Sequence, residues 1–132
     1  MNIGCLHLKN NVFLAPMAGI TDLPFRTVAR SFGCGLAFTE MVSGSGLVRG
    51  MEKTFRYVTA SPEDRPLGVQ LFGCDPETLA AAARIAAELG ADLLDVNMGC
   101  PVKKVAKTGS GASLMRDPER AAAILRAVRN GR

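Results

Sequence analysis

The sequence predicts an α/β fold in which short buried strands alternate about four times with helices that cover them. One observation behind this prediction is that three segments, residues 22–33, 75–90 and 117–131, begin with an aspartate followed within two residues by proline and close with glycine. A second is that short apolar runs lie between these segments. A third is that the 132 residues are 48% hydrophobic, which is enough for one core and one domain over residues 1–132.

The three capped segments are predicted to be helices with defined boundaries. An aspartate accepts hydrogen bonds from the free amides of the first turn, proline there loses no helical bond, and glycine past the end tolerates the left-handed conformation. Apolar side chains recur at helical spacing, so we expect each helix to bury one face. The residues of these faces are Phe25, Val28, Ala29 and Phe32 in the first helix, Leu79, Ala82, Ala83, Ala86 and Leu89 in the second, and Ala121, Ile124, Leu125 and Val128 in the third.

Four apolar runs have the length and composition of buried strands: residues 12–15, 36–39, 67–72 and 93–96. Their mostly unbroken hydrophobicity is typical of parallel strands that are covered on both faces. A shorter helix is predicted over residues 45–51, and it completes the alternation of strand and helix.

Two further segments are predicted to lie outside this alternation. Residues 52–65 are polar and contain Ser61-Pro62, so we expect an irregular excursion between the short helix and the third strand. Near the start of the chain, residues 6–10 are expected to pair in a small hairpin whose turn is formed by residues 9–11.

Charge and cysteine content narrow the classes of function. Sixteen basic and twelve acidic side chains give a formal charge of +4, which favours approach to a polyanion without identifying one. The apolar stretches are broken well before the roughly 18 residues of a membrane span, so we expect a soluble, cytoplasmic protein. The four cysteines form no CxxC pair and His7 is the only histidine, so no metal site is expected. Three cysteines are expected to be small packing residues: Cys5, Cys34 and Cys74.

Small and polar residues gather at the carboxyl ends of the predicted strands. In parallel α/β proteins that rim carries the ligand site, whether the sheet closes into a barrel or stays open. Residues 16–19 are small enough for their backbone to approach a flat ligand, or they form only a tight turn. A carboxamide in an apolar strand needs a partner, which is either neighbouring backbone or a ligand. The rim residues are Pro16, Met17, Ala18, Gly19, Glu40, Gln70 and Asn97.

A thiol and two cations follow the fourth predicted strand, within residues 95–105. Cys100 stands in the string Gly-Cys-Pro, and Lys103 and Lys104 come shortly after it. A thiol near cationic side chains can act as an acid or as a nucleophile. The same glycine, cysteine and proline could also form only a sharp turn, so composition leaves both interpretations open.

The next segment, residues 107–113, is rich in glycine and hydroxyl side chains. It lacks the Gly-Lys-Ser/Thr end of a phosphate-binding P-loop, so nucleotide hydrolysis is not predicted. We interpret it as a flexible loop beside the site. Its lysine, Lys107, either contacts a phosphate backbone together with Lys103 and Lys104 or belongs to a cluster that is only solvated.

Four motifs occur together along the chain, and they are Ala15-Pro16-Met17-Ala18-Gly19-Ile20-Thr21-Asp22, Thr39-Glu40-Met41-Val42, Gln70-Leu71-Phe72-Gly73 and Asn97-Met98-Gly99-Cys100-Pro101. In this order they resemble the tRNA-dihydrouridine synthases, and the two lysines after Cys-Pro are similar to the bacterial DusB-like branch. The resemblance implies a partial TIM (β/α) barrel of the FMN-linked oxidoreductase type, with residues 1–132 as its amino-terminal half. The rest of the barrel and the family's carboxy-terminal helical RNA-binding domain are expected to be absent.

The resemblance also implies an activity: the FMN-dependent, NADPH-driven reduction of the C5–C6 double bond of uridines in tRNA. Cys100 would protonate C5. This role is chemically reasonable, because hydride delivery to C6 builds negative charge towards C5 and O4, which a positioned acid relieves. The implied flavin-contacting residues are Pro16, Met17 and Ala18 along the isoalloxazine, Gln70 at its polar edge, and Asn97, which orients uracil or flavin near the thiol.

The implied partner is tRNA, whose uridine must leave its stack to reach the flavin. Lys103, Lys104 and Lys107 are expected to contact the nearby phosphates. A half-barrel would also expose two strand edges and an apolar inner face, so we expect self-association or partial disorder.

Two other interpretations stay open from sequence alone. One is a different FMN β/α-barrel reductase, of the dihydropyrimidine or dihydroorotate dehydrogenase type, in which a loop cysteine also exchanges a proton at a pyrimidine C5. The other is a fragment without activity that serves only as a folding or RNA-binding module.

Overall fold

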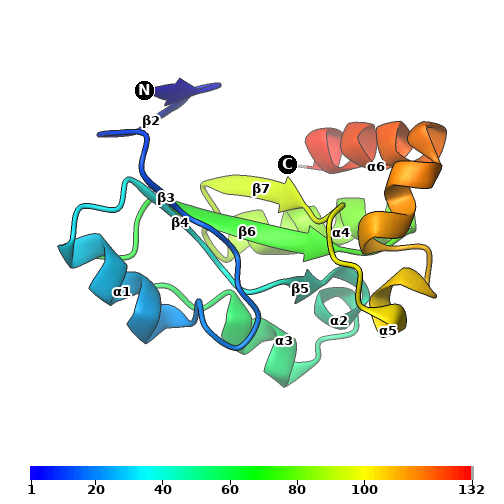
Figure 1. Cartoon of the computed structure of the whole chain (residues 1–132), viewed down its shortest axis with the longest axis horizontal. Coiled ribbons are helices and arrows are strands. Elements are labelled where there is room, and N and C mark those ends of the chain that lie inside the picture. The colour runs from blue at the N-terminus through cyan, green and yellow to red at the C-terminus, as the bar shows by residue number, and fades with distance from the viewer. Residues whose placement is uncertain (132) are drawn as a thin grey trace.

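The computed structural model describes residues 1–131 as a mixed α/β arrangement around a parallel sheet (Figure 1). Four strands of this sheet lie side by side in chain order: β3 (Phe13–Leu14), β4 (Leu36–Phe38), β6 (Leu67–Phe72) and β7 (Leu93–Val96). The pairings between them are parallel. A parallel sheet in which each strand neighbours the next along the chain is consistent with part of a β/α barrel.

The strand next to β6 is divided into two short pieces. β4 pairs with the start of β6, with Ala37 opposite Leu67, and β5 (Val42–Ser43) pairs with its end, with Val42 opposite Leu71. The residues between these two pairings leave the regular ladder near the carboxyl rim. The sequence predicted β4 but not β5, because two residues are too few to show a pattern of their own.

The three capped helices lie close to where the sequence predicts them: α1 (Leu23–Ser31), α4 (Pro76–Glu88) and α6 (Pro118–Gly131). The side chain of Asp22 accepts from the N–H of Phe25, and that of Asp75 accepts from the N–H of Thr78. The caps therefore have the function that their residue types predict. One boundary differs, because α6 continues through Gly131 instead of ending before it.

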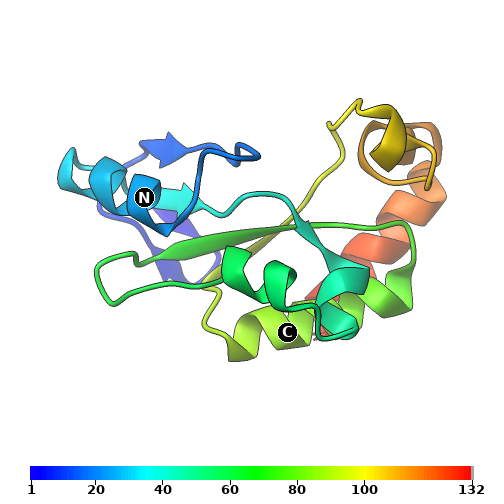
Figure 2. The ribbon, with the colours of Figure 1, turned by 90° about the horizontal axis from the view of Figure 1, so that it is seen from below.

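The hydrophobic core lies between the sheet and the pair α4 and α6. Figure 2 shows α4 running along one face of β6, with α6 beside it. Alternate residues of a strand point to the same face, so one side of β6 supplies apolar side chains to this core. The buried residues that meet there include Leu67, Val69, Leu71, Leu79, Ala82, Ala83, Ala86, Ile124 and Val128.

The expected apolar face of α1 is exposed, and this part of the prediction was wrong. Phe25, Val28 and Phe32 are open to solvent, with Phe32 87% exposed, and α1 instead buries Arg26. Leu89 of the segment after α4 and Leu125 of α6 are exposed as well. Helical spacing shows that apolar side chains share a face, but it does not show what covers that face.

Two predictions around the short helices also need correction. The helix expected over residues 45–51 is α2 (Gly44–Val48), and the supposedly irregular segment begins with a further helix, α3 (Glu52–Tyr57). An ion pair one turn apart, between Glu52 and Arg56, lies on its exposed side. Such a short, polar helix lacks the regularly spaced apolar residues from which a helix is predicted.

A leading hairpin forms over residues 2–7, so the prediction that residues 6–10 pair around a turn at residues 9–11 was wrong. β1 (Asn2–Ile3) pairs antiparallel with β2 (Leu6–His7), and the turn contains Gly4, whose φ of 58° lies in the left-handed region. Asn10, expected in the turn, instead donates to the carbonyl of Gly33 and accepts from the N–H of Val12. Glycine lacks a Cβ atom and adopts a positive φ without steric cost, which explains why the turn lies there.

The segment after β7 is more ordered than predicted. It forms α5 (Lys103–Ala106) and the 3₁₀ helix η1 (Gly111–Arg116), both beyond the carboxyl ends of the strands (Figures 1 and 2). Among the described residues, no helix has the combination of length and apolar character that crossing a membrane requires.

Candidate functional site

A series of side-chain hydrogen bonds crosses the carboxyl ends of β6 and β7. Gln70 and Asp95 are partners in the strand register, and Nε2 of Gln70 donates to Oδ2 of Asp95 at 2.6 Å. Nδ2 of Asn97 in turn donates to Oε1 of Gln70 at 3.0 Å. The amide of Gln70 is therefore held by two other side chains, and the two carboxamides predicted at the rim contact each other.

Asn97 connects this series to the cysteine loop. Its Oδ1 accepts from the backbone N–H of Cys100 at 3.0 Å and from that of Gly99 at 3.3 Å. A carbonyl oxygen has two lone pairs, so these bonds use the full acceptor capacity of the Asn97 side chain. Its interaction with the loop therefore fixes where the backbone of Cys100 lies.

The opposite side of Cys100 is held by η1 and the turn before it. The N–H of Ala112 donates to the carbonyl of Cys100 at 3.0 Å. Gly111 has a φ of 61°, and a Cβ at this position would lie 2.6 Å from the carbonyl oxygen of Cys100. Only glycine fits there without displacement, so the loop predicted to be flexible packs closely on the half-buried Cys100.

The segment after β3 is folded into a closed turn. The N–H of Met17 donates to Oγ1 of Thr21 at 3.0 Å, while the N–H groups of Ile20 and Thr21 both donate to the carbonyl of Met17. Thr21 is fully buried, whereas Ala18 and Gly19 at the tip are exposed. The turn therefore presents backbone at the rim, and its base is part of the interior.

Two residues between β4 and β5 connect this turn to β6. A carboxylate oxygen of Glu40 accepts from the N–H of Gly19. The hydroxyl of Thr39 donates to the carbonyl of Glu40 at 2.7 Å and accepts from the N–H of Gln70 at 3.3 Å. The turn after β3 and the Gln70–Asn97–Cys100 series are thus joined through the segment between β4 and β5.

The three predicted RNA-contacting lysines lie on or directly after α5. Lys103, Lys104 and Lys107 are all exposed, and within residues 1–131 none of them forms an ion pair. Residues three and four apart lie on one side of a helix, so Lys107 shares a side with both of the others. Their ammonium groups are available to a polyanion.

The remaining cysteines differ from one another. Cys34 is buried, as expected, and its thiol lies 3.1 Å from the carbonyl oxygen of Leu36. Cys74 is half-buried, and Cys5 is exposed, so the prediction that Cys5 packs in the interior was wrong. It lies in the turn of the leading hairpin, where a short loop leaves no room for burial.

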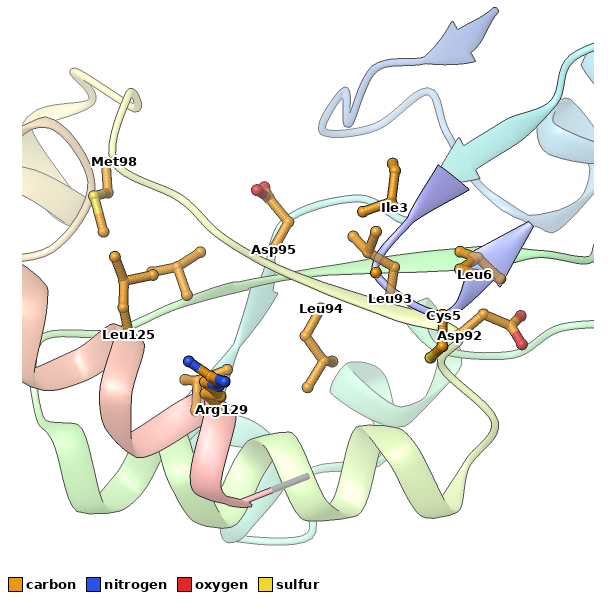
Figure 3. A pocket seen from close by; sticks show the side chains of 13 residues that line it. Ile3, Cys5, Leu6, Asp92, Leu93, Leu94, Asp95, Met98, Leu125 and Arg129 are labelled. Carbon is orange, nitrogen blue, oxygen red and sulfur yellow. The ribbon is translucent and has the colours of Figure 1, made fainter. Parts of the chain in front are cut away.

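A mostly apolar cavity lies beside β7. Its volume is about 570 Å³, and Figure 3 shows it bounded by the leading hairpin, by β7 and by α6. Most of the side chains that line it are apolar. The lining residues labelled in Figure 3 include Cys5, Leu6, Leu93, Asp95, Met98, Leu125 and Arg129.

Among residues 1–131, no three histidine, cysteine, aspartate or glutamate side chains gather as metal ligands would.

Sequence reasoning missed three residues of the hydrogen-bonded site: Asp95, Thr39 and Thr21. A signal was present for Asp95, because a carboxylate stands between two apolar residues of a predicted strand. The threonines gave no comparable signal, since threonine is common in strands and turns. Their roles depend on which backbone groups the fold brings next to them.

One known protein family matches most of the chain. The family model "Dihydrouridine synthase (Dus)" matches residues 13–131. A tRNA-dihydrouridine synthase B of Pasteurella multocida is 45% identical over 128 residues, which are 97% of this chain and 39% of the relative. A probable tRNA-dihydrouridine synthase of Rhizobium leguminosarum is 47% identical over 123 residues, or 93% and 38% of the two chains.

The matched region is therefore a part of these relatives. A tRNA-dihydrouridine synthase B of Xanthomonas axonopodis is 44% identical over 128 residues, and the chain covers 39% of it. The chain spans about two fifths of the length of the curated relatives that it matches. Because the family model covers most of its residues and the similarity to the B-type relatives extends over nearly all of them, this chain belongs to the dihydrouridine synthase (Dus) family.

Proposed function

We propose that this chain forms part of an FMN-dependent tRNA-dihydrouridine synthase in which Cys100 donates a proton to C5 of a uridine. The observation that carries the proposal is the hydrogen-bonded series from Gln70 through Asn97 to the backbone of Cys100. It places a thiol-bearing loop in a defined position at the rim where parallel α/β proteins bind ligands. The names of the curated relatives support the same reaction.

The residues at the rim fit a flat, polar-edged cofactor. One N–H and one lone pair of the Gln70 carboxamide remain after its bonds to Asp95 and Asn97, so it can still bond a ligand as donor or acceptor. The family resemblance assigns Pro16, Met17 and Ala18 to the flavin, and of these Ala18 is exposed at the tip of the turn after β3. When bound there, FMN reduced by NADPH supplies the hydride that goes to C6.

The part of Cys100 in the reaction is proton transfer. Addition of a hydride to C6 leaves an electron pair at C5, and the thiol proton forms the new C5–H bond while the thiolate remains on Cys100. Solvent returns the proton before the next turnover. Asn97 and Ala112 hold the backbone of Cys100 on two sides, so little of its freedom has to be lost when the uridine arrives.

We propose tRNA as the polyanionic partner and the cytoplasm as the compartment of the reaction. Lys103, Lys104 and Lys107 lie just beyond the Cys100 loop, where their charges would contact phosphates on either side of a uridine that has left its stack. The overall positive charge of the chain favours the same approach.

We further propose that residues 1–132 form the first half of a flavin-binding barrel and that the isolated chain self-associates. Within the described residues, β7 pairs with β6 on one side only, and the apolar cavity lies beside it. An unpaired strand edge next to apolar surface favours addition of another strand.

The test begins with a titration of the purified chain with FMN, followed by flavin fluorescence. NADPH-dependent formation of dihydrouridine is then measured in unmodified tRNA, with wild-type protein and with Cys100→Ala. We expect flavin binding in both and loss of at least about a hundredfold in turnover in the variant, which is typical of removing a proton donor. Cys74→Ala, also half-buried, is the matched control and should retain turnover.

The outcomes separate the proposal from its competitors. Full turnover by Cys100→Ala would contradict the role of the thiol. Reduction of free uracil or orotate in preference to tRNA would favour the other pyrimidine reductases. Salt-sensitive tRNA binding without any flavin binding would leave the chain as an RNA-binding module that is not catalytic by itself.

A further inference from the structure

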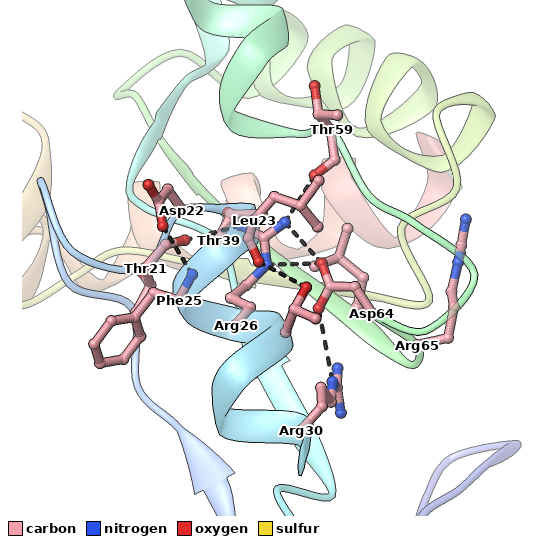
Figure 4. A network of polar contacts seen from close by, with 12 residues as sticks. Thr21, Asp22, Leu23, Phe25, Arg26, Arg30, Thr39, Thr59, Asp64 and Arg65 are labelled. Atoms are coloured by element: carbon pink, nitrogen blue, oxygen red, sulfur yellow. Dashed lines mark hydrogen bonds and ion pairs between the residues drawn. The ribbon is translucent and has the colours of Figure 1, made fainter.

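A buried ion pair lies beneath the turn after β3, outside the Gln70–Cys100 series. Arg26 of α1 is 1% exposed and Asp64, before β6, is 0% exposed. Nε of Arg26 donates to Oδ2 of Asp64 at 2.9 Å, and Nη2 lies 2.8 Å from the same oxygen (Figure 4). Removing two charges from water is costly, and an apolar pair of similar size often stabilises a fold equally well. A gain in stability therefore does not by itself explain this buried ion pair, and the other hydrogen bonds of Arg26 bear on its role.

The guanidinium of Arg26 also holds two backbone carbonyls. Nη1 donates to the carbonyl of Thr21 at 2.8 Å, and Nη2 donates to that of Thr59 at 2.7 Å. Arginine has a rigid fork of five N–H donors, so one side chain can tie three segments together in fixed directions. Asp64 holds the fork in place, and Thr21 and Thr59 lie on different sides of it in Figure 4.

Thr21 transmits this restraint to the proposed flavin-binding turn. Its N–H and its hydroxyl both donate to the carbonyl of Met17, at 3.0 and 3.2 Å, and its hydroxyl oxygen accepts from the N–H of Met17 at 3.0 Å. Met17 is thus bonded through both of its backbone groups to a residue whose own carbonyl is held by Arg26. The series runs without a break from Asp64 to the turn.

Arg30, one turn further along α1, provides an internal comparison. Its Nε lies 3.6 Å from Oδ1 of the same Asp64, and it donates to the carbonyls of Cys34 and Pro66. It therefore shares the carboxylate with Arg26, and its side chain is 8% exposed, but its backbone partners are near the starts of β4 and β6. No described hydrogen bond connects Arg30 to residues 17–21.

We propose that Arg26, oriented by Asp64, is a positioning residue that fixes the backbone of the turn from Met17 to Thr21 for cofactor binding. The inference rests on the proposed function, because it gives that turn its role. Arg26 would act through Thr21 and would not itself touch the cofactor or the substrate.

The test compares Arg26→Lys with Arg30→Lys by site-resolved amide hydrogen exchange of the ligand-free chain. Lysine keeps the positive charge beside Asp64 but cannot hold the carbonyls of Thr21 and Thr59 together. We expect the amides of Ile20 and Thr21 to exchange about tenfold faster in Arg26→Lys and to change less than about twofold in Arg30→Lys. Amides of β6 serve as the reference for global stability.

Two results would overturn the positioning role. One is equal acceleration of the turn amides by both lysine variants, and the other is acceleration of turn and β6 amides by the same factor, which would show only a loss of stability. If Arg26→Lys does not fold, Thr21→Val removes the hydroxyl link without changing a buried charge. Unchanged exchange at Ile20 in that variant would equally overturn the proposal.

A flavin titration of the same variants separates this inference from the proposed function. We expect the Kd for FMN to rise about tenfold in Arg26→Lys relative to Arg30→Lys, in proportion to the lost order of the turn. If the turn amides of Arg26→Lys exchange faster but the affinity for FMN is unchanged, Arg26 still positions the turn. The use of that turn for cofactor binding would then be overturned.

Discussion

At the residue scale, the site depends on side chains that hold backbone rather than on charges that face one another. Asn97 binds two loop amides and Gln70, Thr39 binds the N–H of Gln70, and Thr21 binds both backbone groups of Met17. Each of these residues orders a loop at the carboxyl rim. Such bonds determine where the thiol and the backbone groups lie before any ligand arrives.

Asn97→Ala should therefore affect the cysteine loop more than the fold. The substitution leaves the N–H groups of Gly99 and Cys100 without their acceptor, so we expect the free energy of unfolding to fall by about 1–3 kcal/mol. Dihydrouridine formation should fall about tenfold or more because the thiol is no longer positioned. Asn130→Ala, at the exposed end of α6, is the control, and equal turnover in both variants would contradict this role.

The lysines of α5 should contribute to RNA binding through charge alone. Each phosphate contact that is lost lowers the slope of log K against log salt by about 0.7–0.9, so a variant with Lys103, Lys104 and Lys107 changed to Ala should lose about two units. Filter binding of tRNA over a range of salt concentrations measures this slope. Lys9→Ala, an exposed lysine near the leading hairpin, should leave it unchanged, and a triple variant with the wild-type slope would exclude these lysines from the interface.

At the scale of elements, the capped helices form where their boundaries are written in the sequence. The N-cap of α4 shows the physical cause. Oγ1 of Thr78 donates to the carboxylate of Asp75 at 2.6 Å and the N–H of Thr78 donates to it at 2.8 Å. These bonds, with the charge of Arg120 as a smaller cause, lower the pKa of Asp75 below its ordinary value of 3.8.

This shift predicts how the cap depends on pH. A carboxylate whose pKa is lower in the folded state contributes stability that is fully present above its unfolded pKa and is lost as the pH falls through the folded value. Asp75→Asn should therefore lower the urea midpoint at neutral pH, and its difference from wild type should shrink as the pH falls below 3.8. Glu77→Gln, which changes an exposed acid of the same first turn, is the control. A difference in urea midpoint between Asp75→Asn and wild type that does not depend on pH would contradict the prediction.

α1 illustrates the limit of such element-level reasoning. Its ends were predicted correctly, but its apolar residues face solvent while Arg26 and Arg30 turn towards Asp64. Periodicity identifies a shared face in a helix and says nothing of the partner segment. Only the fold showed that residues 58–65 bring a carboxylate under this helix.

At the scale of the whole molecule, the parallel sheet has an outer strand, β7, whose residues are only half-buried. The sequence predicted strands covered on both sides, and β6 fits that description while β7 does not. The apolar cavity between β7, α6 and the leading hairpin lies at this edge (Figure 3). Self-association through it is the molecular-scale prediction.

Leu125→Lys tests this edge directly. Leu125 lines the cavity and is 49% exposed, so a charge there should oppose burial in an interface without disturbing the core. In sedimentation at tens of micromolar, we expect the wild-type chain to form dimers or larger species and the variant to shift towards monomer. Val48→Lys is matched in exposure, at 45%, and lies outside the cavity. A strictly monomeric wild-type chain would contradict the prediction.

The sequence by itself determined the order of strands and capped helices, the rim at which Gln70, Asn97 and Cys100 lie, and the family. These features are local, because a cap, an apolar run or a motif needs only neighbouring residues to be recognised. The tertiary structure alone decided which side chains meet: Asp95 with Gln70, Glu40 with Gly19, and Asp64 with Arg26. These partners are more than 20 residues apart, and their contact depends on strand register and on how the loops return to the sheet.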